Sequence, residues 1–422
     1  MLFSKLGVQR NQMSDFGWVM FSKSAFKLSL IFLCIFLSFF NGAAIFYSHS
    51  FSKPFISVDH EVLDFLEINT KFSFFMRIIG GYFLGKLADK IGFFKTMKLI
   101  GLGFIIASFS LVFFDPLHIF ESEILLCLVH GLMSFLRWSC FILPVIYIFQ
   151  HNQKIKRFSH SAIAWTAAIF ALFFANLCTT IFSNTNQLTW CIIYGLVGLI
   201  TNAIYSYIEI LPRPNLQKTD VDPISKQAFL LAFLLSGLCA VCISYQYSFI
   251  EYYLKNVMII NTAGQQLIYS PFWITLVLTL IPAAHITKKL ETIKILQKSL
   301  LGILFSVGLF YLIPLFDHSI LVIHQVIYAI SFGLFLPPAL RFIYRLLHGY
   351  NFYFPMSFTF SLGFSSFILI SNQLAKLNLF PAPLVGASLI TLLMLACLLI
   401  NHTYGLSQKN TELRKRIAHT YK

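Results

Sequence analysis

Charged residues are scarce in this chain, and acidic residues are the scarcest. Only 11% of its 422 residues are charged and 58% are hydrophobic, whereas soluble domains have about 25% charged residues. One water-soluble core could not bury this much apolar surface, so a soluble globular fold is excluded. None of the 16 acidic residues lies near the middle of a long apolar segment. The chain therefore lacks the buried carboxylate that many proton-coupled carriers use.

Motifs of enzymes and of ATP-driven pumps are also missing. The sequence contains no HExxH, no GxSxG, no P-loop and no GxGxxG followed by an acidic residue. We therefore expect no enzyme activity, no cofactor and no ATP-driven transport. Cys239 and Cys242 form a CxxC pair, but no His and no second pair stands near them. No metal site is predicted for that reason.

Long apolar segments make up most of the chain. Twelve of them reach the roughly 17–25 residues that a membrane-spanning helix needs. The predicted fold class is an all-α polytopic membrane protein, with twelve transmembrane helices in two six-helix pseudosymmetric bundles, and its expected surroundings are the lipid bilayer. The predicted spans are 26–48, 66–84, 96–114, 124–148, 161–183, 187–210, 227–250, 267–286, 295–316, 319–340, 353–375 and 383–403.

The longest polar break in the middle of the chain covers residues 211–226. Pro212, Pro214 and Pro223 lie in it, and proline stops one helix and delays the next. The break divides the spans into two sets of six, which is the layout of transporter repeats. The predicted parts are a cytoplasmic N-terminal segment 1–25, a bundle 26–210, a cytoplasmic loop 211–226, a bundle 227–403 and a basic cytoplasmic tail 404–422, which could form one surface helix.

The basic residues follow an alternating pattern along these spans. Nearly all of the 31 lie in segments that share one side of the membrane if both termini are cytoplasmic, while only Lys53, Lys255 and Lys376 lie on the other side. Cytoplasmic loops of membrane proteins have such an excess. The net charge of +15 is thereby explained without a nucleic-acid partner. Lys is more frequent than Arg, and Phe occurs 48 times. This composition is typical of an AT-rich genome and favours a bacterial inner membrane.

Arg137 is the sharpest functional candidate. It lies about 20 Å along its predicted span at 1.5 Å per residue, near the middle of the bilayer. An arginine there costs about 2.5–3.5 kcal/mol, so a substrate path, an ion pair or bound carbonyl groups must offset the cost. His130, Ser134 and Phe141 share its helix face if the helix is continuous.

A second arginine, Arg77, lies about as deep in the second span, where it either lines the path or holds helices together. The Glu67–Lys71 pair toward the outer end of that span can neutralise itself. His130 and His324 are the only mid-span groups that could titrate near neutral pH, and each either handles protons or packs by hydrogen bonds. Further path candidates, which could equally join helices, are Asn41, Asn176, Tyr245, Gln246, Tyr328, Asn372 and Gln373.

The turn between the second and third spans carries the most specific pattern. It reads GGYFLGKLADKIGFFK over residues 80–95, with Gly85, Asp89, Lys90 and Gly92 in characteristic positions. This pattern resembles the signature loop of the major facilitator superfamily, although Phe93 and Phe94 stand where that family usually has Arg or Lys. The glycines are expected to allow a tight reversal, and Asp89 to accept hydrogen bonds from a helix N-terminus or to pair with Arg157 at a cytoplasmic gate.

Within that superfamily the chain resembles the metabolite:proton symporters, which include proline/betaine, α-ketoglutarate and shikimate carriers. The resemblance rests on Arg77 with Gly80 and Gly81, on Arg137-Trp138, and on the run 352–358. Arg137 stands where those carriers have an intramembrane Glu. The resemblance therefore implies a monomeric secondary transporter of a small polar metabolite with an anionic group. The alternatives are a proton-coupled proline/betaine-type zwitterion symporter, an exporter of apolar compounds and a non-transporting membrane receptor.

The charge pattern predicts orientation directly. Both termini and Lys288 should face the cytoplasm, and loop 49–65 should face outward. A single cysteine introduced at position 288 should react with an impermeant maleimide only after the membrane is opened. Labelling from outside in intact cells would contradict the orientation.

Overall fold

A computed structural model describes residues 26–41, 59–114, 123–151, 160–181, 187–210, 224–250, 253–254, 270–280, 282–283, 292–310, 319–347, 352–376 and 382–420. The predicted N-terminal segment 1–25, most of the central loop 211–226, loop residues 49–58, Arg157 and Lys288 lie outside these ranges. So do the side chains of Glu67 and Asn176.

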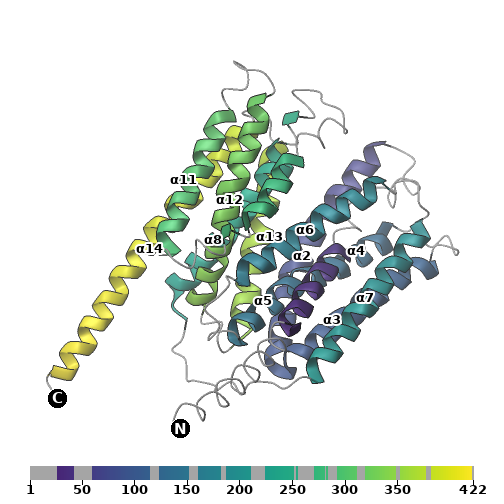
Figure 1. The fold of residues 1–422 in the computed structure, drawn as a ribbon, viewed down its shortest axis with the longest axis horizontal. Coiled ribbons are helices and arrows are strands. Elements are labelled where there is room, and N and C mark those ends of the chain that lie inside the picture. The colour runs from purple at the N-terminus through teal and green to yellow at the C-terminus, as the bar shows by residue number, and fades with distance from the viewer. Residues whose placement is uncertain are drawn as a thin grey trace, which may run out of the picture.

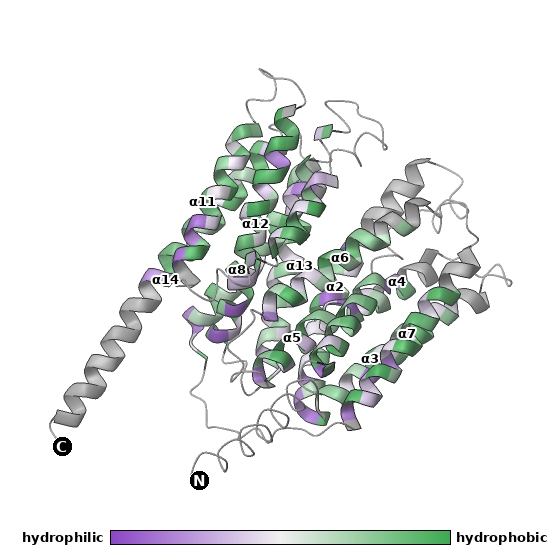
Figure 2. Cartoon of the chain, in the orientation of Figure 1, coloured by the Kyte–Doolittle hydropathy of each residue, from purple (hydrophilic) through white to green (hydrophobic). Residues whose placement is uncertain are grey.

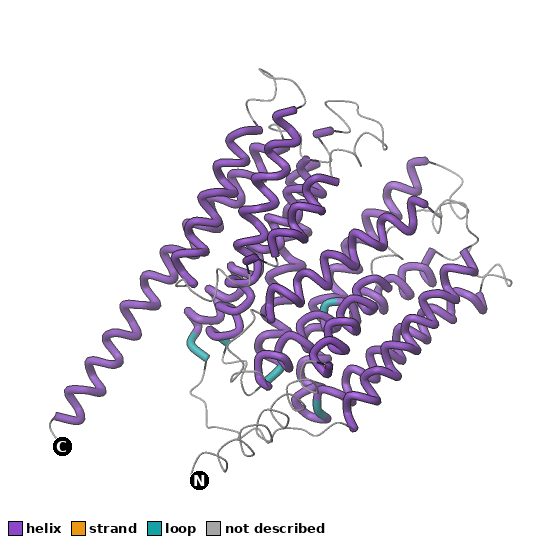
Figure 3. The backbone as a smooth tube through the Cα atoms, viewed as in Figure 1, coloured by secondary structure: helices purple, strands orange, loops and turns teal. Residues whose placement is uncertain are grey.

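The described part of the chain is built from helices (Figures 1 and 3). Each of the twelve predicted spans contains one. Seven spans are long and apolar enough to cross a membrane, and the helices Phe26–Asn41, His160–Ala175 and Ser270–Leu280 are shorter but apolar. The labelled elements are α2 (Asp59–Ile91), α3 (Phe93–Phe114), α4 (Glu123–Arg137), α5 (Ser139–His151), α6 (His160–Ile181), α7 (Gln187–Ile210), α8 (Lys226–Ser244), the π-helix η4 (Tyr245–Ile250), α11 (Thr292–Phe310), α12 (Ser319–Leu346), α13 (Phe354–Lys376) and α14 (Ala382–Thr420).

Two helices are longer than their apolar segments. The second span was predicted as 66–84, but α2 covers Asp59–Ile91. The last span was predicted as 383–403, and α14 continues through the polar tail to Thr420, projecting away from the bundles in Figure 1. Hydropathy marks only the part of a helix that lies in the bilayer, whereas the backbone hydrogen bonds continue past the membrane boundary.

Several pairs of helices pack closely together, most of them distant in sequence. Within each half, α3 packs with α7, α8 with α13, and α11 with α12, whereas α2 packs against α13 of the other half. Hydrophobic residues predominate along these helices (Figure 2). Many of the large apolar side chains are exposed, among them Phe75, Phe305 and Leu399 at 59%, 63% and 69%. Such exposure is unfavourable in water and ordinary next to lipid chains, as expected for a multi-pass membrane protein.

Glycine sets the distance between α2 and α4. A Cβ atom on Gly80 would lie 1.9 Å from the carbonyl oxygen of Phe135, and one on Gly131 would lie 2.3 Å from the ring of Phe72. Both distances are shorter than any van der Waals contact, so only glycine allows the two backbones to approach this closely. The α2–α4 crossing brings the segment around Arg77 next to the end of α4.

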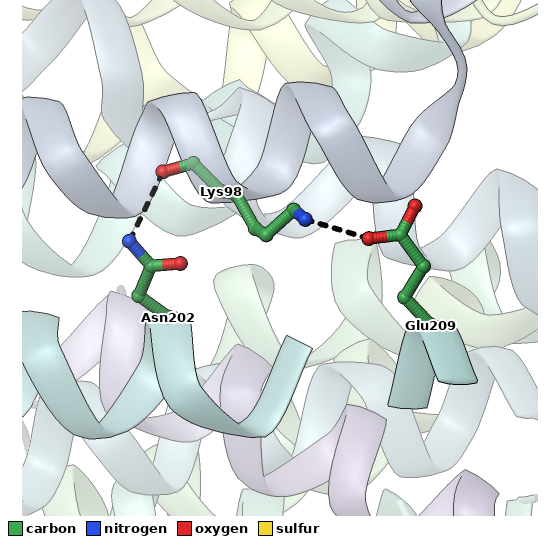
Figure 4. Close-up of polar contacts among 3 residues, drawn as sticks. All are labelled: Lys98, Asn202 and Glu209. Atoms are coloured by element: carbon green, nitrogen blue, oxygen red, sulfur yellow. Dashed lines mark hydrogen bonds and ion pairs between the residues drawn. The ribbon is translucent and has the colours of Figure 1, made fainter. Parts of the chain in front are cut away.

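A polar contact joins α3 and α7 (Figure 4). The Lys98 ammonium lies 2.6 Å from a Glu209 carboxylate oxygen, and the Asn202 side-chain amide donates a hydrogen bond of 3.4 Å to the Lys98 carbonyl. The charged groups are partly exposed, at 33% and 22%. Solvent weakens such a pair to about 0–1 kcal/mol, so it aligns two helix ends without fixing the fold.

The close crossing predicts a matched pair of substitutions. Gly80→Ala should force α2 and α4 apart because the added methyl group meets a backbone atom, which cannot rotate away. Gly308→Ala in α11 meets nothing within 4 Å and serves as the control. We expect the melting temperature of the purified protein to fall by several degrees in the first variant only. Equal melting temperatures would show that α2 and α4 are not in close contact.

Candidate functional site

The fourth span is broken at Arg137. Helix α4 ends at this residue and α5 begins at Ser139, and the amides of Phe141 and Ile142 both donate to the Trp138 carbonyl, at 3.1 and 3.0 Å. Pro144 lies inside α5 and cannot supply the amide that a regular helix needs there. One turn residue thus interrupts the helix between Arg137 and Phe141, but both side chains still contact the Phe39 ring.

The break changes the surroundings of Arg137. The residue occupies the last turn of α4, where backbone carbonyl groups carry partial negative charge that stabilises a cation. Its guanidinium carbon lies 5.7 Å from the centre of the Phe39 ring. The side chain is partly exposed, although its Nε atom is buried.

The structure brings Arg77 and Arg137 together. Arg77 is only 5% exposed, and its guanidinium carbon lies 4.4 Å from the Phe74 ring centre. Its charge and that of Arg137 repel each other, because Coulomb energies are large where solvent screening is weak. The α2–α4 crossing thus creates a buried position of concentrated positive charge, supplied by hydrogen-bond donors that fit oxyanions.

Several other candidates bind backbone carbonyl groups instead. The Asn41 amide donates to the Tyr194 carbonyl at 3.2 Å, and the Tyr328 hydroxyl donates to the Cys242 carbonyl at 2.7 Å. His324 Nδ1 lies 2.6 Å from the Ser306 carbonyl. Since a carbonyl only accepts, this nitrogen carries the proton. Each contact joins two helices, which is the packing role that the sequence left open.

The remaining path candidates are less closely tied to the arginines. His130 is partly exposed on α4, two turns before Arg137. Gln246 is buried at 1% exposure in η4, a π-helix where a continuous α-helix was predicted. The ring of Tyr245, at the start of η4, stacks on that of Tyr328 at 5.0 Å. π-Helices widen the backbone and are frequent at functional sites, but the sequence carries no signal for one.

A second site lies where α2 meets α13. One Asp89 oxygen accepts a hydrogen bond from the Tyr353 amide at 2.6 Å, and the other accepts from the Phe354 amide at 3.0 Å. The carboxylate thus caps the N-terminus of α13, where the helix dipole favours negative charge. This is one of the two partners that the sequence predicted for Asp89. It joins the two halves of the chain at their predicted cytoplasmic side.

The glycines of the signature have different functions. Gly92 has φ of +92°, which favours glycine, and it forms the predicted reversal between α2 and α3. Gly85 lies inside α2 and forms no turn, contrary to expectation. A Cβ atom on it would lie 2.9 Å from the Phe354 Cα, so it allows α13 to approach. Lys90 is exposed in the last turn of α2.

Aromatic rings fill the space beside the Asp89 cap. Phe93 stacks between Tyr147 and Tyr353, with ring centres 4.5 and 5.9 Å away, and Phe149 of α5 contacts Tyr344 of α12 at 4.7 Å. The sequence identified Phe93 and Phe94 only as departures from the basic pattern. They are 5% and 3% exposed, so they pack where basic side chains are usual, and apolar contact closes this side.

The contacts between α2 and α13 keep one register along both helices. A Cβ on Gly81 would lie 2.4 Å from the Ser361 hydroxyl oxygen, and one on Gly85 would lie 3.0 Å from the Ser357 Cβ. Four residues further along α2, Asp89 meets the start of α13. The same register in the other direction places Arg77 level with the turn that contains Phe364 and Ser365. The arginine pair and the Asp89 cap therefore lie at two ends of one helix interface.

Comparison with known proteins identifies the fold. No protein-family model matches the chain, and no curated protein matches its sequence. Three solved structures are similar: the human organic anion transporter MFSD10 (11% identity, TM-score 0.65, 88% of this chain and 98% of that one), a bacterial homologue of the iron transporter ferroportin in the outward-facing state (13%, 0.68, 89% and 99%), and the major facilitator superfamily transporter FucP in the outward conformation (11%, 0.63, 88% and 98%). The predicted all-α membrane fold with twelve transmembrane helices in two bundles is thereby confirmed.

The Asp89 cap predicts a conformational phenotype. Asp89→Asn keeps one acceptor oxygen and replaces the other with a donor that faces an amide, and it removes the charge that the helix dipole favours. We expect transport to fall at least tenfold at normal membrane expression. A cysteine at exposed Lys90 should also react faster with thiol reagents from the cytoplasmic side. Wild-type transport and unchanged labelling in Asp89→Asn would contradict this function of the cap.

Proposed function

We propose that the protein is a secondary transporter that moves a small polar metabolite with an anionic group across a bacterial inner membrane by alternating access. The observation that carries the proposal is the pair Arg77 and Arg137, placed together by the α2–α4 crossing. Carriers of this fold class bind substrate near the bilayer midplane, between their two halves. The sequence predicts both arginines at about that depth.

Charge explains why the substrate is an anion. A single guanidinium at the bilayer centre costs about 2.5–3.5 kcal/mol, and a second one adds repulsion. An oxyanion beside both would offset these costs and could accept parallel hydrogen bonds from Arg137. The two acidic side chains that the structure describes, Asp89 and Glu209, are engaged at the α13 N-terminus and with Lys98. The human organic anion transporter shares the fold, and so does the homologue of an iron transporter, so the proposal rests on the arginines and not on the fold.

The contacts at the predicted cytoplasmic side support an outward-facing state. The Asp89 cap and the rings around Phe93 hold the two halves together there. Two of the similar structures are described as outward-facing or outward. Transport to the cytoplasm then requires that α13 separate from α2. Because Gly81 and Gly85 have no side chains, few side-chain contacts between α2 and α13 have to break at these positions.

A proline/betaine-type zwitterion symporter is the second candidate. The carboxylate of a zwitterion could bind Arg137 with the same strength as the carboxylate of an anion. What separates the two is the cationic end, which two arginines repel. A co-transported proton would need His130 or His324, and the bond from His324 to the Ser306 carbonyl favours a packing role for that histidine. We propose that the protein acts as a monomer with both termini in the cytoplasm.

Charge selection is tested by substitution at Arg137. Arg137→Lys should weaken anion binding about tenfold to a hundredfold, because a fork of donors becomes a single ammonium. Arg137→Glu should abolish anion uptake and shift preference toward zwitterions. The measurement is inhibition of uptake into vesicles by matched anions, zwitterions and cations. Arg345→Lys, on an exposed position of α12, is the control and should leave the inhibition pattern unchanged.

Two results would overturn the proposal. One is a wild-type preference for cations. The other is normal transport by Arg137→Ala, which would leave Arg137 with a structural role only.

A further inference from the structure

Arg137 borders a cluster of six aromatic side chains from both halves of the chain. The Trp138 ring lies 4.2 Å from that of Phe364, and Phe141 lies 4.6 Å from Trp165. Trp138 directly follows Arg137, and Phe39 both underlies the Arg137 guanidinium and contacts Trp138 at 5.6 Å. The members of this central aromatic cluster, each less than 10% exposed, are Phe39, Trp138, Phe141, Trp165, Phe360 and Phe364.

Two groups in the cluster lack hydrogen-bond partners. The indole nitrogens of Trp138 and Trp165 are buried, and neither has a partner among the described residues. An indole N–H is only a donor, and leaving one buried and unbonded is unfavourable. The hydroxyl groups of Ser134 and Ser365 nearby are unpartnered as well. Together with the guanidinium groups, this region offers many donors and suits a ligand rich in acceptor oxygens.

The geometry narrows the class of ligand. Resting on the proposed anion transport, we infer that the substrate is an aromatic carboxylate. Its carboxylate binds the Arg137 guanidinium and accepts a hydrogen bond from the Trp138 indole. Its ring packs against Phe39, Trp138 and Phe364, and so contacts both halves of the protein at once.

Packing favours a planar ring over a saturated body of similar size. Aromatic pairs prefer offset or edge-to-face contacts at 4.5–7 Å, and each adds to the energy of simple burial. The rings already meet in this way: Phe39 contacts Trp138 edge to face, and Phe360 stacks on Phe364 at 5.3 Å. The planar ring of a ligand can take the place of a protein ring in such a contact, whereas a puckered aliphatic ring cannot.

The test compares two seven-carbon carboxylates, benzoate and cyclohexanecarboxylate, on the purified full-length protein. Binding is followed by quenching of tryptophan fluorescence and by the shift in melting temperature. We expect benzoate to bind about threefold to tenfold more tightly. Trp138→Leu should remove this preference. Trp138→Phe keeps a ring but loses the donor, so it should weaken both ligands and retain the preference. Trp273→Phe, at a buried position of the other half, is the control and should change neither.

The outcomes separate the two proposals. Equal binding of the two carboxylates overturns the aromatic inference and leaves anion transport standing. Benzyl alcohol binding as tightly as benzoate would mean that charge is not recognised, which overturns the proposed function on which the inference rests. Preference for benzoate in wild type, lost in Trp138→Leu and kept in Trp273→Phe, supports both.

Discussion

Two guanidinium groups at one depth of a membrane protein are the constraint on which the rest of this structure depends. Each would be costly alone, and together they repel. The chain meets this constraint through its backbone as much as through side chains. The break places Arg137 in the last turn of α4, where backbone carbonyl groups carry partial negative charge. The glycine crossing at Gly80 holds α2 close. In the proposed function, an anionic substrate adds to this stabilisation.

The same helix connects this charge to the closed side. Along α2, Arg77, Gly81, Gly85 and Asp89 follow at intervals of four residues, and the last three contact successive turns of α13. A ligand that moves Arg77 would therefore act on α2, the helix whose other end carries the Asp89 cap. The cap consists of two hydrogen bonds beside stacked aromatic rings. Contacts of this number and kind can hold the cytoplasmic side closed in one conformation and can still break when the protein changes conformation.

The sequence predicted the parts of this account that follow from strong local rules. Hydropathy located the twelve spans, and the signature loop located Asp89 and the reversal at Gly92. It did not reveal the helix break at Arg137, although Pro144 was the available signal, because a proline permits either a kink or a break. The functions of Gly85, Phe93 and Trp138 depend on contacts with α5 and α13, far away in the chain, and no local pattern encodes those. Asn41 and Tyr328 bind backbone carbonyl groups. The sequence could not predict these partners either, because they also depend on packing between distant helices.

The central claim is that an anion occupies the position beside Arg77 and Arg137. The most direct measurement is an experimental density map of the full-length protein with 4-bromobenzoate, in which the bromine marks the ligand. The account predicts density with a carboxylate oxygen within hydrogen-bond distance of the Arg137 guanidinium and the bromine among the rings of the central aromatic cluster. A map in which the ligand lies elsewhere or is not bound would contradict it.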